Sequence, residues 1–159
     1  EIIILGDKMI VKNLKNSREE LQLKQKDVAE LFGLHTSTIS GWETGKDPIP
    51  LSRLIDYANK YYLSLDYLFG LIAKNEEYYE FNLDLVVLAE NLTNLRLSKN
   101  LTQEDIAKIL NTSQSTYCNY ENARNTIKTT FLLGLAKYYR QDDEDFSIDS
   151  LFGRIKKNN

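Results

Sequence analysis

The chain has 159 residues, a net charge of −3 and a sequence pI near 5.3, which gives enough length for two small domains. This acidic balance is not the one expected of a strong nonspecific nucleic-acid binder. The single cysteine, Cys118, excludes an internal disulfide and suits a reducing cytosol. Since no stretch approaches the roughly 20 apolar residues that span a bilayer, we expect a cytoplasmic protein.

Residues 1–8 precede Met9 and open with an apolar run that is too short for a secretory signal. We expect them to be an extension ahead of the first domain, natural or added for expression. Charge is distributed unevenly after them, because lysines and one arginine dominate residues 8–26. Acidic side chains gather at residues 76–90 and 142–149, and we expect those patches to face away from any polyanionic partner.

The first domain, predicted over residues 9–70, is organised around two short helices joined by a turn. In the first of these, Val28, Leu31 and Phe32 recur at the three-and-four spacing that places apolar side chains on one face. Gly33 then takes positive φ without a Cβ penalty, so the chain can reverse. Further helices are expected over residues 10–21 and, after Pro50, over residues 51–62.

The second helix of the pair begins near Thr36 and is expected to turn Ile39 and Trp42 inward. Short hydrogen-bonding side chains can approach base edges in a major groove, where long charged ones would stop at the phosphates. The other face of this helix therefore predicts DNA reading, because its residues are small and almost uncharged: Thr36, Ser37, Ser40, Gly41 and Thr44.

The region from Asn13 to Gly70 resembles the helix-turn-helix domain of the phage-repressor type, the Cro/CI/Xre family. The matching residues, at fixed spacing, are Leu14, Arg18, Gln25, Val28, Ala29, Gly33, Leu34, Ile39, Trp42, Glu43, Gly45 and Lys46. The resemblance implies an all-α, five-helix, lambda-repressor-like domain. We expect no cofactor and no enzymatic activity, because the sequence holds no metal-ligand cluster, glycine-rich phosphate loop or nucleophile motif.

An internal repeat shows that the chain contains this domain twice. At an offset of 78, residues from Asn13 to Tyr61 recur from Asn91 to Tyr139, and after a five-residue insertion the Ser64 to Gly70 segment recurs as Ser147 to Gly153. The predicted fold class is therefore all-α, with two tandem helix-turn-helix domains. The remaining boundaries are a packed connection over 71–82, a second domain over 83–153 and a frayed tail over 154–159.

In the second domain, helices are predicted after an Asn82 cap, from Thr102, over residues 114–122 and over residues 129–139. Several positions depart from the family pattern: Asn111 replaces the turn glycine, Thr112 replaces an apolar residue, Tyr117 and Tyr120 stand for Ile39 and Trp42, and Ala123 replaces Gly45. These departures leave open that the second domain has turned to dimerisation or to a protein partner.

Base reading is expected from the start of each DNA-reading helix and from one turn further on. Gln114 is the sharpest candidate, because a glutamine amide can bind adenine N6 and N7 together, worth roughly 1–3 kcal/mol of discrimination. Thr36 offers only a hydroxyl and a methyl group, so the two domains should prefer different half-sites. The candidate base readers are Thr36, Ser37, Gly41, Gln114, Ser115 and Asn119.

The resemblance makes Gln25 and Gln103, which begin the second helix of each domain, anchors for a DNA phosphate. Lys46 and Arg124 add charge just past the DNA-reading helices, although a solvated surface charge is the alternative for both. The candidate phosphate contacts are Gln25, Thr44, Lys46, Gln103, Asn122 and Arg124. The resemblance also implies structural ion pairs between Arg18 and Glu43 and between Arg96 and Glu121, each 25 positions apart.

The predicted function is a prokaryotic transcriptional regulator, for example a repressor, that reads double-stranded operator DNA with both domains, as an internal pseudo-dimer or within a homodimer. The alternative is an antitoxin-like or adaptor protein that uses one domain for DNA and the other for dimerisation or a protein partner. No membrane partner is expected. The sequence does not indicate the operator, an inducer, or activation as opposed to repression.

Overall fold

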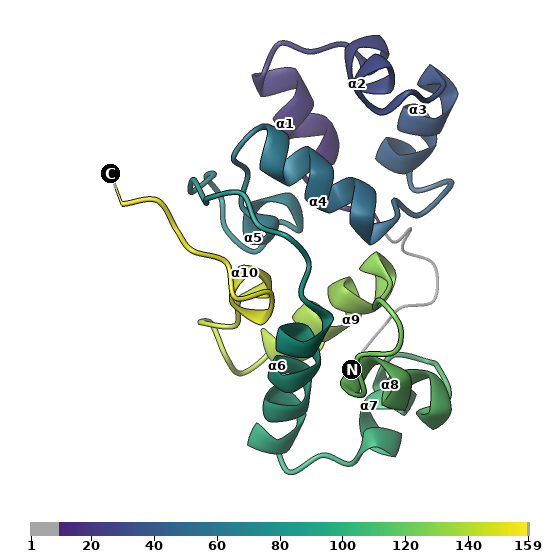
Figure 1. Ribbon diagram of the computed structural model, residues 1–159, viewed down its shortest axis with the longest axis vertical. Coiled ribbons are helices and arrows are strands. Elements are labelled where there is room, and N and C mark those ends of the chain that lie inside the picture. Colours follow the sequence, from purple (N-terminus) through teal and green to yellow (C-terminus); the bar gives the residue numbers. More distant parts are fainter. Residues whose placement is uncertain (1–9, 159) are drawn as a thin grey trace.

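A computed structural model describes residues 10–158, which form ten α-helices in two domains (Figure 1). The first domain contains α1 (Leu14–Glu20), α2 (Gln25–Phe32), α3 (Thr36–Thr44), α4 (Leu51–Lys60) and α5 (Leu65–Leu68). The second contains α6 (Leu85–Ser98), α7 (Gln103–Ile109), α8 (Gln114–Glu121), α9 (Thr129–Tyr139) and α10 (Ile148–Leu151). The predicted all-α fold with two tandem helix-turn-helix domains is confirmed. The predicted extension over 1–8 lies outside the described residues.

In both domains, a residue in the left-handed backbone conformation makes the turn between the paired helices. Gly33 has φ 64° after α2, and Asn111 has φ 54° after α7. Asparagine tolerates this conformation better than most residues with a Cβ atom. The second domain therefore keeps the same turn without a glycine.

Polar caps fix where α6 and α7 begin. The Thr102 hydroxyl accepts a hydrogen bond from the Asp105 amide (3.1 Å), and the Asp105 carboxylate accepts one from the Thr102 amide (2.8 Å), which completes the predicted capping box. The predicted Asn82 cap is wrong. Helix α6 begins two residues later, because the Asp84 carboxylate accepts from the amides of the second and third residues of the helix.

The core of each domain forms beneath its helix-turn-helix pair. Ile39 and Trp42 of α3 are buried, and so are their α8 counterparts, Tyr117 and Tyr120. The two tyrosine rings pack edge to face with their centroids 6.3 Å apart. The bulkier aromatic pair therefore holds α8 against its domain in the way that isoleucine and tryptophan hold α3.

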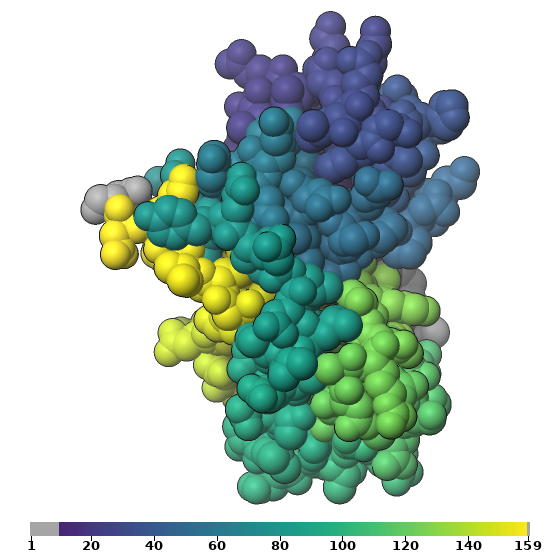
Figure 2. Space-filling model, viewed as in Figure 1, coloured from purple at the N-terminus to yellow at the C-terminus, as the bar shows by residue number. Residues whose placement is uncertain are grey.

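The tail does not fray at residues 154–157, so the prediction of a frayed tail is wrong there. Lys157 donates its amide to the Glu77 carbonyl (2.8 Å), and the Tyr79 amide donates to the Ile155 carbonyl (2.9 Å). The tail therefore runs antiparallel to the connecting segment, and the two lie side by side in the space-filling view (Figure 2). The sequence contains no alternating strand pattern that would have revealed this pairing.

The connecting segment is itself bound to the first domain. Asn59 of α4 donates its side-chain amide to the Phe81 carbonyl (2.8 Å) and accepts the Phe81 amide (3.2 Å). Phe81 also packs edge to face on Phe152, with ring centroids 5.9 Å apart. Because Phe81 contacts the first domain through its backbone and the second through its ring, the connection is packed at this residue, as its apolar side chains predict.

Candidate nucleic-acid interface

The first turns of α3 and α8 are open to solvent. Thr36 and Ser37 are exposed on α3, and Gln114 and Ser115 are exposed on α8. Both helices lie on the same side of the molecule, at the right of Figure 1. Neither helix start is covered by another described part of the chain, so each can meet a large ligand.

One turn further along each helix, the predicted base readers Gly41 and Asn119 are less exposed than the sequence suggests. Gly41 is buried, and a Cβ atom at this position would lie 2.8 Å from the Asp47 carboxylate oxygen. The loop after α3 folds back over the helix there, because the Asp47 amide donates to the Gly41 carbonyl (3.2 Å). This burial argues against the predicted role of Gly41 as a base reader, while its counterpart Asn119 is half-buried.

Buried ion pairs hold the far ends of α3 and α8 to the first helix of each domain. Arg18 Nε lies 2.5 Å from Glu43 Oε1, and Arg96 Nε lies 2.7 Å from Glu121 Oε1. Each arginine also donates to a backbone carbonyl five residues later. Hydrogen bonding to the carboxylate raises the pKa of both arginines, so both guanidinium groups are charged at neutral pH.

The two glutamines that begin α2 and α7 join these networks. The Gln25 side-chain nitrogen donates to Glu43 (2.9 Å), and the Gln103 side-chain nitrogen donates to Glu121 (2.9 Å). Both amides therefore turn one donor inward, toward the buried carboxylate. A phosphate contact at these helix starts stays a prediction, with the unpaired backbone amides of the first turn as further donors.

The other predicted phosphate contacts lie at the surface. Lys46 and Arg124 are exposed and form no ion pair within residues 10–158. Thr44 is exposed, but its hydroxyl donates to the Ser40 carbonyl (2.9 Å), so only its acceptor capacity is free. Asn122 is exposed, and its side-chain amide points toward the Cys118 sulfur (3.1 Å).

Exposed cations flank α3 and α8, although the exposed Asp47 carboxylate also lies beside α3. Lys24, exposed, precedes α2, and Lys128, exposed, precedes α9. The acidic residues of α2 and α7 are largely occupied, since Glu30 lies 3.8 Å from Lys26 and Glu104 lies 3.2 Å from a lysine one turn later. The local charge is therefore compatible with a phosphate backbone, although the whole chain is acidic.

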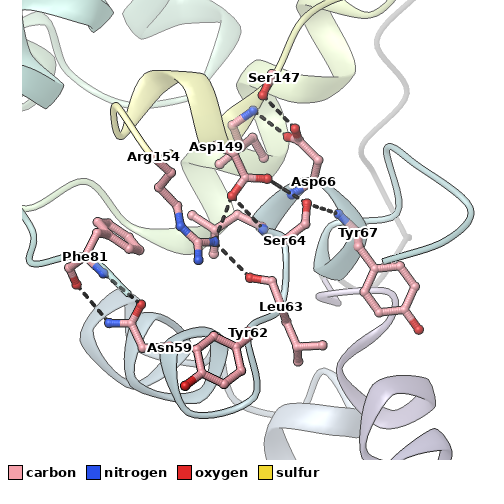
Figure 3. Close-up of polar contacts among 12 residues, drawn as sticks. Asn59, Tyr62, Leu63, Ser64, Asp66, Tyr67, Phe81, Ser147, Asp149 and Arg154 are labelled. Carbon is pink, nitrogen blue, oxygen red and sulfur yellow. Dashed lines mark hydrogen bonds and ion pairs between the residues drawn. The ribbon is translucent and has the colours of Figure 1, made fainter. Parts of the chain in front are cut away.

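Sequence reasoning missed the polar contact between the domains, which Figure 3 shows. Asp149 is 1% exposed and pairs with Arg154 (Nη1–Oδ1 2.8 Å). Arg154 also donates to the Leu63 carbonyl of the first domain (2.8 Å). The repeated Ser-x-Asp sequence was visible at both places, but nothing in it indicated that the two copies touch.

Other kinds of site are not supported by residues 10–158. In this part of the chain no group of histidine, cysteine and acidic residues could hold a metal ion. No helix there has the length and apolar character needed to cross a membrane.

Comparison with known protein families identifies both domains. A family model described as "Helix-turn-helix" matches residues 14–68, which cover α1 to α5, and a second, described as "Helix-turn-helix domain", matches residues 87–147. No curated protein and no solved structure matches the chain. The chain is thus a helix-turn-helix DNA-binding protein with two such domains in tandem, the first of the Cro/CI/Xre type.

Proposed function

We propose that the protein is a sequence-specific transcriptional regulator that reads the major groove of double-stranded DNA with α3 and α8. The observation that carries the proposal is the exposed, uncharged first turn of each helix, with Thr36 and Ser37 on α3 and Gln114 and Ser115 on α8. Such side chains can reach base edges, while exposed cations beside them bind phosphates.

The buried networks behind these helices support the proposal. A side chain can discriminate between bases only if its helix holds a fixed position relative to the backbone contacts. The Arg18–Glu43 and Arg96–Glu121 pairs, at 2.5 and 2.7 Å, attach the end of each DNA-reading helix to the rest of its domain. They therefore act as positioning residues and do not themselves contact DNA.

Selection of bound duplexes from a random pool tests the proposal with the whole chain. We expect an enriched motif and an affinity that falls steeply with salt. Gln114→Ala should relax the preference at one adenine position by about 5- to 150-fold, which corresponds to roughly 1–3 kcal/mol. Gln141→Ala, at an exposed glutamine after α9, is the matched control and should leave the motif unchanged.

The same selection distinguishes the alternative of an adaptor. If Gln114→Ala leaves the motif unchanged while Thr36→Ala alters it, the second domain does not read DNA and the adaptor hypothesis is preferred. If no motif is enriched at any salt concentration, sequence-specific regulation through α3 and α8 is rejected.

A further inference from the structure

The contact between α5 and α10 is reciprocal. Asp66 of α5 accepts hydrogen bonds from the Ser147 hydroxyl and from the amide of the following residue, both at 2.6 Å, where α10 begins. Asp149 of α10 accepts from the Ser64 hydroxyl (2.7 Å) and from the amide of the following residue (2.9 Å), where α5 begins. Each carboxylate therefore caps the first turn of the other domain's helix (Figure 3).

This reciprocity defines how the domains are related. In the internal repeat, Ser64 corresponds to Ser147 and Asp66 corresponds to Asp149. When two units present the same residues to each other, they are related by a two-fold rotation, whereas a head-to-tail arrangement joins unlike surfaces. The α5–α10 contact therefore lies on an approximate two-fold axis within one chain.

A second contact between the domains also joins corresponding segments. Residues 48–52, at the start of α4, and residues 126–130, at the start of α9, line one groove of about 440 Å³. These segments correspond at the offset of 78. The Thr129 hydroxyl, in the second segment, donates to the Ile49 carbonyl in the first (2.7 Å). The counterpart of Thr129 in the first domain, Leu51, has no hydroxyl, so this hydrogen bond is not reciprocal. Because corresponding segments meet here, the approximate axis passes near the starts of α4 and α9.

Polar contacts fix each domain to its part of this interface. Asn13, just before α1, donates its side-chain amide to the Tyr67 carbonyl of α5 (2.7 Å). Asn91 of α6 donates in the same way to the Leu151 carbonyl of α10 (2.9 Å). Since α1 and α6 also carry the arginines that hold α3 and α8, the interface sets the relative orientation of the two DNA-reading helices.

A two-fold relation has a specific consequence for DNA. Two readers related by such an axis meet the duplex in opposite directions and match an inverted repeat, while two readers related by translation would match a direct repeat. The exposed residues at the two helix starts are unlike, Thr36 on one and Gln114 on the other. The two halves of the matching site must then differ in sequence.

We propose that one chain, without a second copy, binds an inverted repeat of two unlike half-sites. This inference rests on the function proposed above and adds the symmetry of the site and the number of chains on it. A second copy cannot use the α5–α10 surface, because Ser64 is 0% and Asp149 is 1% exposed within the chain.

The test uses the whole chain and the two half-sites recovered from a random pool. Duplexes carry these half-sites as an inverted repeat or as a direct repeat, with centre-to-centre spacings scanned around one helical turn of about 10 base pairs. A duplex with one half-site is the reference. Affinity is measured by fluorescence anisotropy, and the number of chains on each duplex by sedimentation velocity.

We expect the inverted repeat to bind at least about tenfold more tightly than the direct repeat or the single half-site, since the second domain binds intramolecularly. One chain should saturate the duplex. Equal or tighter binding to the direct repeat overturns the proposed symmetry, and two chains on one inverted repeat overturn the proposed number. Recovery of a single half-site also overturns the inference but leaves sequence-specific binding intact, whereas recovery of no motif rejects both.

Discussion

Asp66 lies beside Asp149 in the buried contact between the domains, and only Asp149 is paired with a cation, Arg154. Burial, and then the charge of Asp149, raise the pKa of Asp66 from 3.8 to about 6. The two domains are thus joined through a pair of carboxylates, of which one has a cationic partner and the other has none within residues 10–158. The difference arises because the first domain has Leu71 where the second has Arg154.

The raised pKa of Asp66 predicts a loss of stability as pH rises from about 4 through 6. Within this window the folded state binds more protons than the unfolded state, so the free energy of unfolding falls with increasing pH. Asp66→Asn keeps an acceptor and removes the charge. The difference in the free energy of unfolding between the variant and the natural protein should therefore change with pH. We expect it to shift in favour of the variant by on the order of 1–3 kcal/mol as pH rises from 4.5 to 7.5. Urea unfolding at several pH values measures this difference, and a constant difference would contradict the assignment.

The neighbouring substitution should behave in the opposite way. Asp149→Asn removes the counterion of Arg154, whose side chain is 0% exposed, and leaves an unpaired buried charge. We expect the free energy of unfolding to fall by about 3–5 kcal/mol at pH 7. Since Asp66→Asn has the same change in shape and charge, it is the matched control. Equal effects of the two substitutions would show that Arg154 does not depend on Asp149.

The ion pair behind α8 predicts a similar dependence within one domain. Glu121→Gln leaves Arg96, whose side chain is 12% exposed, without its carboxylate partner. The expected loss in the free energy of unfolding is about 3 kcal/mol. Glu104→Gln, at an exposed pair on α7, should change it by less than about 1 kcal/mol. Chemical denaturation followed by circular dichroism distinguishes these values.

Charge at the proposed interface predicts the salt dependence of DNA binding. Lys46→Ala and Arg124→Ala each remove an exposed cation, the first just after α3 and the second just after α8. Each variant should lower affinity about equally for all sequences and reduce the slope of log affinity against log salt by about 1. Lys60→Ala, at the exposed end of α4, is the control and should leave the slope unchanged. An unchanged slope in either variant would remove that residue from the interface.

The equivalent residues after α3 and α8 are both in the left-handed conformation, but one is a glycine and the other an alanine. Exchanging these residue types should therefore change stability in opposite directions at the two positions. Gly45 has φ 72° after α3, and Ala123 has φ 54° at the equivalent place after α8. An alanine in this conformation costs about 1–2 kcal/mol, part of which is offset by the smaller entropy of its unfolded chain. Ala123→Gly should therefore raise the midpoint of thermal unfolding and Gly45→Ala should lower it, as measured by calorimetry.

The sequence predicted the two domains because their pattern is local. Apolar spacing, left-handed turn residues and caps act within a few residues, so the positions of α2, α3, α7 and α8 could be inferred. Contacts that depend on tertiary structure were less accessible. The fold-back of Asp47 onto Gly41 and the inward turn of Gln25 toward Glu43 both depend on a loop or helix elsewhere in the domain.

The relation between the domains could not be predicted, for a different reason. A repeat in the sequence is equally consistent with two-fold and with head-to-tail packing of the domains, because each domain carries the same surfaces whichever way they are packed. The two-fold packing is selected because Asp66 and Asp149 each fit onto the start of the other domain's helix. These two residues are 83 positions apart along the chain. No local pattern reports contacts of that range.

The bond from Ser64 to Asp149 joins residues that are 85 positions apart. During translation, the first helix-turn-helix domain therefore leaves the ribosome long before the carboxylate that caps its last helix has been made. If α3 and α8 read DNA as proposed, a nascent or prematurely terminated chain presents one reader without the partner that sets a fixed geometry. Binding to a two-part site then waits until nearly the whole of the described chain has been synthesised.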